Sequence, residues 1–124
     1  MKLLESGEMY LETILILSKQ MKRVHAVDVA DYMGFSKPSV SRGLARLKAD
    51  DYIEVREGCN CLHLTEKGKE VAERIYERHM VITEMLLRIG VSPEAAAEDA
   101  CKIEHDLSDE TFELLKAHSK KLNK

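Results

Sequence analysis

Residues 36–48 read SKPSVSRGLARLK, and this stretch decides the fold of the chain. Ser36 suits the N-cap of a helix, and Pro38 is tolerated in a first helical turn. The apolar residues that follow recur at helical spacing and share one face: Val40, Leu44 and Leu47. Such a stripe predicts a short helix that packs against a core through these three side chains.

The opposite face of this predicted helix is basic. It carries four cations and no acid between residues 36 and 48, although the whole chain has a formal net charge of −3. Cationic side chains suit phosphates, and hydroxyl or guanidinium groups near the start of such a helix can reach base edges in a major groove. An ordinary solvated basic face is the alternative. The predicted DNA-binding residues are Lys37, Pro38, Ser39, Ser41, Arg42, Arg46 and Lys48.

The segments on either side favour DNA recognition. Residues 26–33 have the spacing of another helix, which Gly34 is expected to end. Residues 52–65 form two short alternating runs about a turn that contains Gly58, as in a β-hairpin. Helix, turn, basic helix and hairpin follow one another in the order of a winged helix-turn-helix. That order is more specific than any one of its parts.

Composition limits the remaining possibilities. The 124 residues fit one domain or two very small ones, and two Pro, no Trp and 5% aromatic residues favour helix over sheet. No signal peptide or bilayer-spanning apolar run is visible, and three cysteines suggest a reduced cytoplasm rather than a disulfide framework. The sequence shows no catalytic nucleophile paired with a general base, so nothing in it indicates an enzyme. We expect a mainly α cytoplasmic protein.

Further helices are predicted outside the winged helix. Residues 7–21 have the spacing of a first helix, capped by Ser6 or Gly7, and residues 65–88 have that of a long one. His79 falls on the apolar stripe of the long helix, where a histidine is more often a hydrogen-bonded core residue than a metal ligand. Ser-Pro-Glu and Ser-Asp-Glu runs cap two more helices, at residues 92–94 and 108–110.

Three potential metal ligands lie close together in the second half of the chain. Cys101, Glu104 and His105 stand at i, i+3 and i+4, which places them on one face if the segment is helical. A thiolate, a carboxylate and an imidazole can bind a divalent metal, but most ions need four to six donors. Met9 and Glu12 share a face near the N-terminus and are candidates for further donors. The alternative is that Met9 fills the core and Glu12 is a solvated charge.

Cys59 and Cys61 stand in the predicted wing. At i and i+2 they lie on the same side of a strand, so they can bind a soft metal or take part in redox chemistry. The usual CxxC spacing is absent, and His63 is the one further ligand nearby. Small residues on a wing are the preferred interpretation. A regulator that senses an organic ligand or thiol oxidation through this pair is the alternative function.

Taken in order, these motifs resemble the diphtheria toxin repressor and manganese transport regulator family. The resemblance rests on five motifs: EMYLETI at 8–14, PSVS at 38–41, Leu64-Thr65 followed by Gly68, the predicted helix that carries His79, and ACKIEHDLSDE at 100–110. It implies a metal-dependent repressor of metal-uptake genes that binds a palindromic operator as a homodimer. It also implies a winged helix-turn-helix domain at 1–70 and a helical metal-binding and dimerisation domain at 71–124. The chain ends before the SH3-like domain of longer members, so it resembles the short form.

The resemblance further implies a set of metal ligands. Met9, Cys101, Glu104 and His105 match the iron-responsive branch, while Glu12 and His79 match ligands of the manganese branch. The iron branch takes ligands of a second ion from positions that here hold Thr83 and Ala97, so that second site is incomplete unless Glu12, Glu84 or Glu98 substitutes. Sulfur donors favour later ions, whereas carboxylates and imidazoles accept Fe²⁺ or Mn²⁺ readily. We expect Fe²⁺ or Mn²⁺, with Zn²⁺ or Co²⁺ able to bind in vitro.

Overall fold

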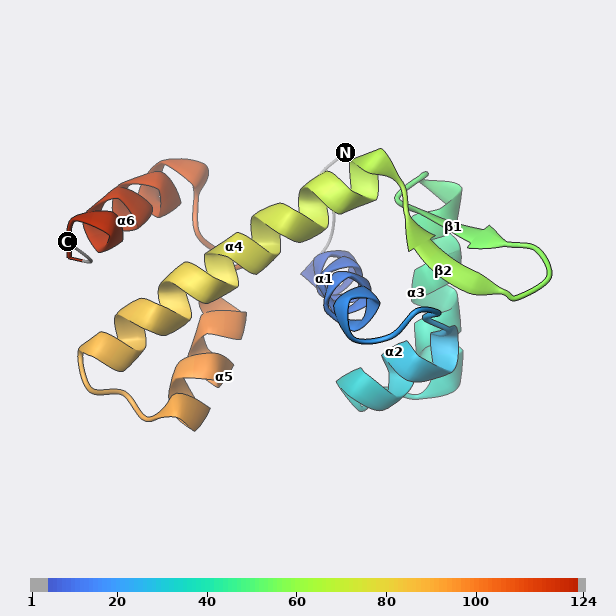
Figure 1. The fold of residues 1–124 in the computed structure, drawn as a ribbon, viewed down its shortest axis with the longest axis horizontal. Helices are drawn as coiled ribbons and strands as arrows, with labels where there is room; N and C mark the ends of the chain where they lie inside the picture. The colour runs from blue at the N-terminus through green and yellow to red at the C-terminus, as the bar shows by residue number, and fades with distance from the viewer. Residues whose placement is uncertain (1–4, 123–124) are drawn as a thin grey trace. The chain divides into compact units, whose positions relative to one another are not determined.

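The computed structural model of the protein describes residues 5–122. Within this range the chain forms six helices and one two-stranded antiparallel sheet (Figure 1). It divides into two compact units, Met1–Glu73 and Arg74–Lys124, and helix α4 (Glu66–Arg88) contributes residues to both. The prediction of a mainly α fold is confirmed. None of the helices in the described range is long and apolar enough to cross a membrane.

The first unit is built from α1 (Glu5–Gln20), α2 (Ala26–Met33), α3 (Lys37–Ala49) and the hairpin. The apolar face predicted for α3 is buried: Val40, Leu44 and Leu47 are 0%, 6% and 2% exposed. They belong to a core that also contains side chains of α1, α2 and β1, among them Leu11, Ile14, Val29 and Ile53. Burial of the apolar stripe leaves the basic face of α3 outward.

Helices α2 and α3 form the helix-turn-helix, and the turn has the predicted chemistry. Gly34 ends α2 with a φ of 72°, in the left-handed region that glycine adopts without steric cost. Ser36 caps α3, because its side-chain oxygen accepts a hydrogen bond from the backbone N–H of Ser39 at 3.3 Å. Local sequence therefore determines where each of the two helices ends and begins.

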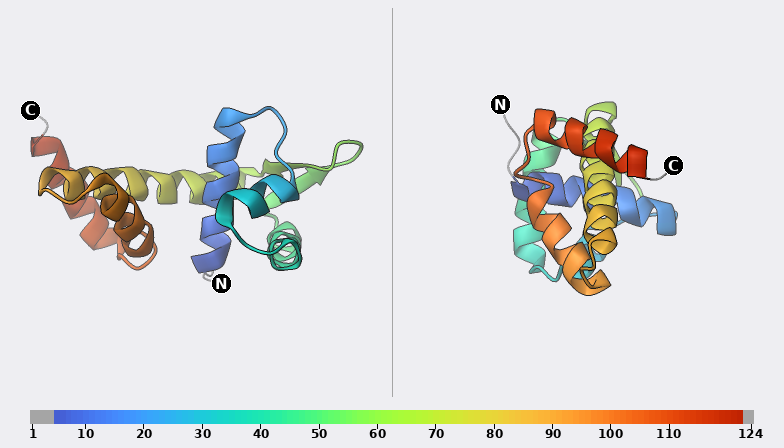
Figure 2. Two further views of the ribbon diagram at one scale, coloured as in Figure 1. Left: turned by 90° about the horizontal axis from the view of Figure 1, so that it is seen from below. Right: turned by 90° about the vertical axis from the view of Figure 1, so that its left-hand side faces the viewer.

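The wing is the antiparallel hairpin of β1 (Ile53–Arg56) and β2 (Cys61–Leu64), in which Arg56 lies opposite Cys61. Its tip extends beyond α2 and α3 (Figure 2). The backbone N–H of Leu62 donates to the carbonyl of Val24 at 2.8 Å, which attaches β2 to the segment before α2. The prediction of a winged helix-turn-helix is confirmed.

Two details of the sequence prediction were wrong. Ser6 and Gly7 do not cap α1 but lie inside it. The cysteines of the wing are joined by a disulfide, although composition favoured reduced thiols. Asn60, between them, has a φ of 56°, and this tight turn brings the two Cα atoms to 5.2 Å, which is within the usual range for a disulfide.

The second unit combines the later part of α4 with α5 (Pro93–Ile103) and α6 (Asp109–Leu122). Both predicted caps are present. The Ser92 hydroxyl accepts from the N–H of Ala95 at 3.3 Å, and the Ser108 hydroxyl accepts from the N–H of Thr111 at 3.1 Å. The three helices bury an apolar core that includes Ile75, Ile82, Ala96, Ala100 and Phe112.

Gly68 is expected to tolerate no side chain. A Cβ atom at this position lies 1.9 Å from the carbonyl oxygen of Tyr52, which also accepts a hydrogen bond from Thr65. Gly68→Ala must therefore displace backbone, and we expect it to lower the free energy of unfolding by about 1–3 kcal/mol. Urea unfolding followed by circular dichroism measures this. Lys69→Ala, at the next and exposed position of α4, is the control, and an equal loss in both variants contradicts the prediction.

Candidate metal centre and nucleic-acid interface

The three predicted ligands of the second unit lie together. The donor atoms of Cys101, Glu104 and His105 are all within 4.8 Å of one another, a separation that lets one ion contact all three. Helix α5 ends at Ile103, earlier than the spacing argument assumed. The side chains converge nevertheless, because Glu104 keeps the right-handed helical backbone with φ −58° and ψ −28°.

The carboxylate of Glu104 is at the centre of this cluster and is fully buried. Its Oε2 lies 2.9 Å from Nδ1 of His79, and its Oε1 lies 3.4 Å from Nε2 of His105. Among the described residues, Oε1 accepts no hydrogen bond of normal geometry. A buried carboxylate is costly unless positive charge compensates it. The buried charge and the donor types around it therefore fit a divalent cation.

His79 reaches the cluster from a different helix. It lies on α4, its side chain is 26% exposed, and its contact with Glu104 spans 25 positions of the sequence. The apolar stripe alone favoured an ordinary core histidine. The structure agrees in part, because the imidazole is hydrogen-bonded and its partner is the carboxylate of Glu104, itself a predicted metal ligand.

Sequence reasoning missed Arg78, which contacts the backbone of the predicted ligand Glu104. The residue is 5% exposed, and its guanidinium donates to the carbonyls of Glu104 at 3.1 Å and Leu107 at 2.7 Å. It also pairs with the carboxylate of Asp109 and lies 5.2 Å from the ring centroid of Phe112. A signal was present in the sequence, because Arg78 interrupts the apolar stripe of α4 with a charge.

Met9 and Glu12 lie in the first unit, three residues apart on α1. Their spacing on the helix is as predicted. Their part in a metal site stays a prediction.

The predicted DNA-binding residues form the outer face of α3. Ser39 is half-buried, and the others are exposed: Lys37, Pro38, Ser41, Arg42, Arg46 and Lys48. The Ser39 hydroxyl receives hydrogen bonds from Ser36 at 2.9 Å and from Arg42 at 3.4 Å. The helix contains no acidic residue, so this exposed face is uniformly cationic or neutral and suits a polyanion.

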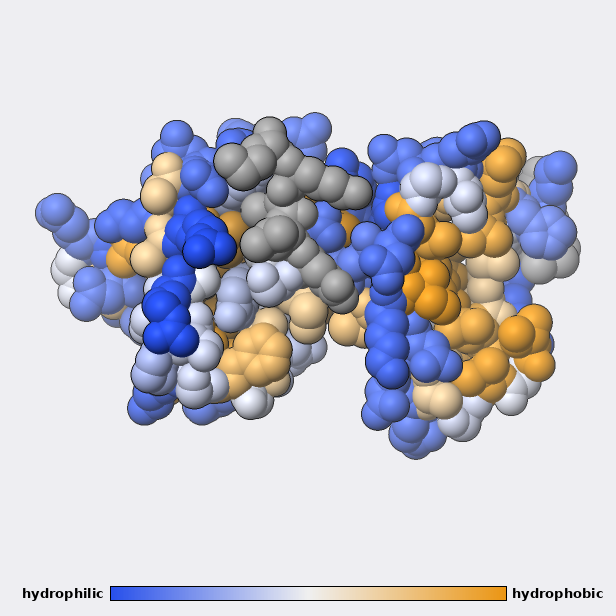
Figure 3. All heavy atoms as spheres, turned by 180° about the vertical axis from the view of Figure 1, so that it is seen from behind, coloured by the Kyte–Doolittle hydropathy of each residue, from blue (hydrophilic) through white to orange (hydrophobic). Residues whose placement is uncertain are grey.

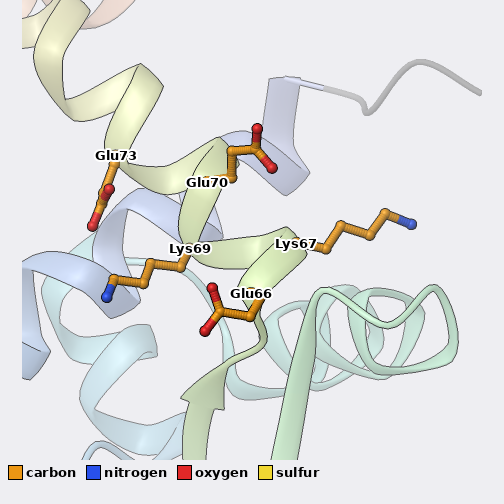
Figure 4. A pocket seen from close by; sticks show the side chains of 5 residues that line it. All are labelled: Glu66, Lys67, Lys69, Glu70 and Glu73. Atoms are coloured by element: carbon orange, nitrogen blue, oxygen red, sulfur yellow. The ribbon is translucent and has the colours of Figure 1, made fainter.

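A pocket at the start of α4 has a different character. Charged side chains of both signs line it and point in different directions (Figure 4): Glu66, Lys67, Lys69, Glu70 and Glu73. Lys67 is already engaged, since its Nζ donates to the carbonyl of Asp50 at 3.0 Å. Small-molecule sites are mostly apolar with a few converging polar groups, so this pocket does not support an organic effector.

Comparison with known proteins covers both units. Residues 2–58 match the model of the iron dependent repressor N-terminal DNA binding domain, and residues 65–124 match that of the metal binding and dimerisation domain. Transcriptional regulator MntR of Escherichia coli is 35% identical over 112 residues, which are 90% of this chain and 72% of that protein. An uncharacterised HTH-type transcriptional regulator of Methanocaldococcus jannaschii is 33% identical over 119 residues, 94% of each chain.

Solved structures show the same relationship. The manganese regulator SloR superposes with a TM-score of 0.81 at 29% identity, covering 94% of this chain and 53% of that one. This chain thus spans about half the length of the SloR chain. IdeR of T. acidophilum shares the fold, with a TM-score of 0.79 at 24% identity over 95% of this chain and 55% of its own. The family resemblance is confirmed, and the chain belongs to the iron-dependent repressors.

Proposed function

We propose that this chain is a metal-dependent transcriptional repressor that binds Fe²⁺ or Mn²⁺ and operator DNA as a homodimer. In this proposal it acts in the cytoplasm and represses metal-uptake genes. The observation that carries the proposal is the buried Glu104 carboxylate, with His79, Cys101 and His105 around it. The same chain presents an exposed basic helix in a winged helix-turn-helix. Among the relatives, MntR is a transcriptional regulator and SloR is a manganese regulator.

The donor set supports Fe²⁺ or Mn²⁺ as the regulatory ion. Two imidazoles and a carboxylate are acceptable to both metals, and the Cys101 thiolate shifts the preference toward Fe²⁺. Zn²⁺ and Co²⁺ accept the same donors and are expected to bind in vitro. The bound ion supplies the positive charge that the buried carboxylate requires.

Metal binding is proposed to control DNA binding by linkage. We assign residues 1–70 to a DNA-binding domain and residues 71–124 to a metal-binding and dimerisation domain, with Met9 and Glu12 of the first completing the donor set. An ion that binds one arrangement of the two domains more tightly than others increases the population of that arrangement. In a dimer, the fixed arrangement sets two copies of α3 about one DNA turn apart, as a palindromic operator requires.

The surface of the second unit supports self-association. Large apolar side chains are exposed there: Met80, Leu87, Ile89 and Leu114. Figure 3 shows hydrophobic side chains gathered on this unit, at the right of the view. Exposed apolar area of this kind is typical of an interface. It agrees with the dimerisation role of the family model that covers residues 65–124.

Operator binding titrated with metal tests the proposal. A duplex is first selected from a random pool with Mn²⁺-loaded protein. Its affinity is then measured by fluorescence anisotropy, after chelation and with Mn²⁺, Zn²⁺, Co²⁺ or anaerobic Fe²⁺ added singly. We expect Fe²⁺ or Mn²⁺ to raise the affinity about 5- to 150-fold. Equal affinity after chelation contradicts the proposal and favours a regulator that senses an organic ligand or thiol oxidation.

Arg42→Ala is expected to weaken operator binding without changing metal affinity in the absence of DNA. Arg42 is exposed near the middle of α3, on the face assigned to DNA, and loss of such a contact costs about 1–3 kcal/mol of binding free energy. Lys120→Ala removes one exposed charge from α6 and is the control for net charge. Altered metal affinity in Arg42→Ala, or equal weakening in both variants, shows that α3 is not the recognition helix.

A further inference from the structure

We propose that Cys59 and Cys61 form a reversible thiol–disulfide site in the wing, oxidised by peroxides and separate from the metal centre. The repressor function does not use this pair, and the family models end and begin on either side of it, at residues 58 and 65. The structure holds the two sulfurs as a disulfide. Two features of the structure surround the pair: the hairpin turn that contains it and the side chain of His25.

The hairpin turn places the two cysteines for reaction with each other. Gly58 and Asn60 both have positive φ, 94° and 56°, so the chain reverses sharply at the pair. The backbone N–H of Cys61 donates to Sγ of Cys59 at 3.3 Å. The strand partner of Cys61 is Arg56, which fixes the far side of the turn through the β-ladder. The site therefore belongs to the folded hairpin.

His25 contacts both cysteines from outside the hairpin. Its Nε2 lies 2.9 Å from the carbonyl oxygen of Cys59, and because a carbonyl only accepts, this nitrogen carries the hydrogen. The same nitrogen is 3.9 Å from Sγ of Cys61. The backbone N–H of His25 donates to a carboxylate oxygen of Asp28 at 2.9 Å, which holds the residue at the start of α2. An N–H donor beside Sγ of Cys61 stabilises the Cys61 thiolate, which is the form that closes the disulfide.

Exposure assigns different roles to the two sulfurs. Cys59 is half-exposed, whereas Cys61 is 1% exposed. The Cys59 thiolate attacks a peroxide oxygen, so that an S–O bond forms, the O–O bond breaks and the released hydroxide takes a proton to become water. The Cys61 thiolate then attacks the Cys59 sulfur; the S–S bond forms, and the S–O bond breaks to release hydroxide, which takes a proton to become a second water. Two thiols are oxidised by two electrons, and one peroxide is reduced.

Peptide mapping of the full chain tests this site. The protein is reduced with a phosphine, exchanged into anaerobic buffer, treated with one equivalent of hydrogen peroxide, alkylated and digested with trypsin. Residues 57–67 form one tryptic peptide that contains both wing cysteines and excludes Cys101. We expect this peptide to lose two hydrogen masses before Cys101 reacts, and glutathione to restore both thiols. A peptide recovered as dithiol, as overoxidised acid or linked to a second chain overturns the proposal.

Two comparisons of the oxidation rate show whether the folded surroundings promote the reaction or whether any two neighbouring cysteines react in this way. The same reaction in urea removes the folded turn, and His25→Ala removes the N–H donor, whereas His25→Gln keeps a side-chain N–H. We expect oxidation to be about tenfold slower in urea and in His25→Ala, with partial recovery in His25→Gln. Equal rates in all forms overturn the proposal. Cys59→Ser is expected to lose this oxidation while keeping metal-dependent operator binding, so this test is independent of the repressor function.

Discussion

Glu104→Gln is expected to remove metal-dependent operator binding while the chain stays folded. Glutamine has nearly the same shape as glutamate but carries no charge, and a neutral amide is a much weaker ligand for Fe²⁺ or Mn²⁺. Substitutions in the surroundings of metal sites already cost about 10- to 100-fold in affinity, so a loss of at least about 100-fold is expected for a central ligand. Calorimetric titration with Mn²⁺ measures this loss of metal affinity.

Stability without metal separates a ligand from a structural residue at this position. The Glu104 carboxylate is fully buried, with His79 and His105 as its neighbours. If its purpose is to bind a cation, removal of the charge leaves metal-free stability unchanged or higher. If it is a structural ion-pair partner, the metal-free protein is destabilised. Glu113→Gln, at an exposed position of α6, is the matched control. Metal affinity retained in Glu104→Gln rules out the proposed site.

Features that depend on local sequence were predictable. The helix-turn-helix follows from the Ser36 cap, the apolar spacing of α3 and the left-handed turn at Gly34, all of which act within a few residues. Cys101 and Glu104 converge for a similar reason. Although α5 ends at Ile103, one further residue in helical conformation is enough to keep the i, i+3 relationship.

Features that depend on tertiary contacts were not predictable from spacing. The pairing of His79 with Glu104 joins α4 to the end of α5, and periodicity along one helix gives no information about which helix lies beside it. The family resemblance, rather than physical reasoning, indicated His79 as a ligand. The disulfide was missed because the composition favoured reduced thiols, and because alternating residues predict a hairpin without showing that Asn60 has a positive φ.

Arg78→Lys is expected to lower both the stability of the second unit and its metal affinity. One guanidinium contacts two carbonyls and the Asp109 carboxylate, and a single ammonium group cannot reproduce this planar geometry. One of those carbonyls belongs to Glu104 itself, so the arginine fixes the backbone that positions a predicted ligand. We expect a loss of about 2–4 kcal/mol in unfolding free energy, from buried acceptors left without donors. Metal affinity should fall about 10- to 100-fold.

The controls for Arg78 separate the carbonyl contacts from the ion pair. Arg88→Lys changes an exposed arginine of the same helix, which pairs with Glu84 at 2.7 Å, and is expected to cost less than about 1 kcal/mol. Asp109→Asn removes the ion pair but leaves both carbonyl contacts, and the Asp109 side chain is 80% exposed. Urea unfolding and Mn²⁺ titration therefore rank the three variants by their losses of stability and of metal affinity. If Asp109→Asn is as damaging as Arg78→Lys, the surface ion pair holds the turn. If only Arg78→Lys loses metal affinity, the buried hydrogen bonds to the Glu104 and Leu107 carbonyls position the site.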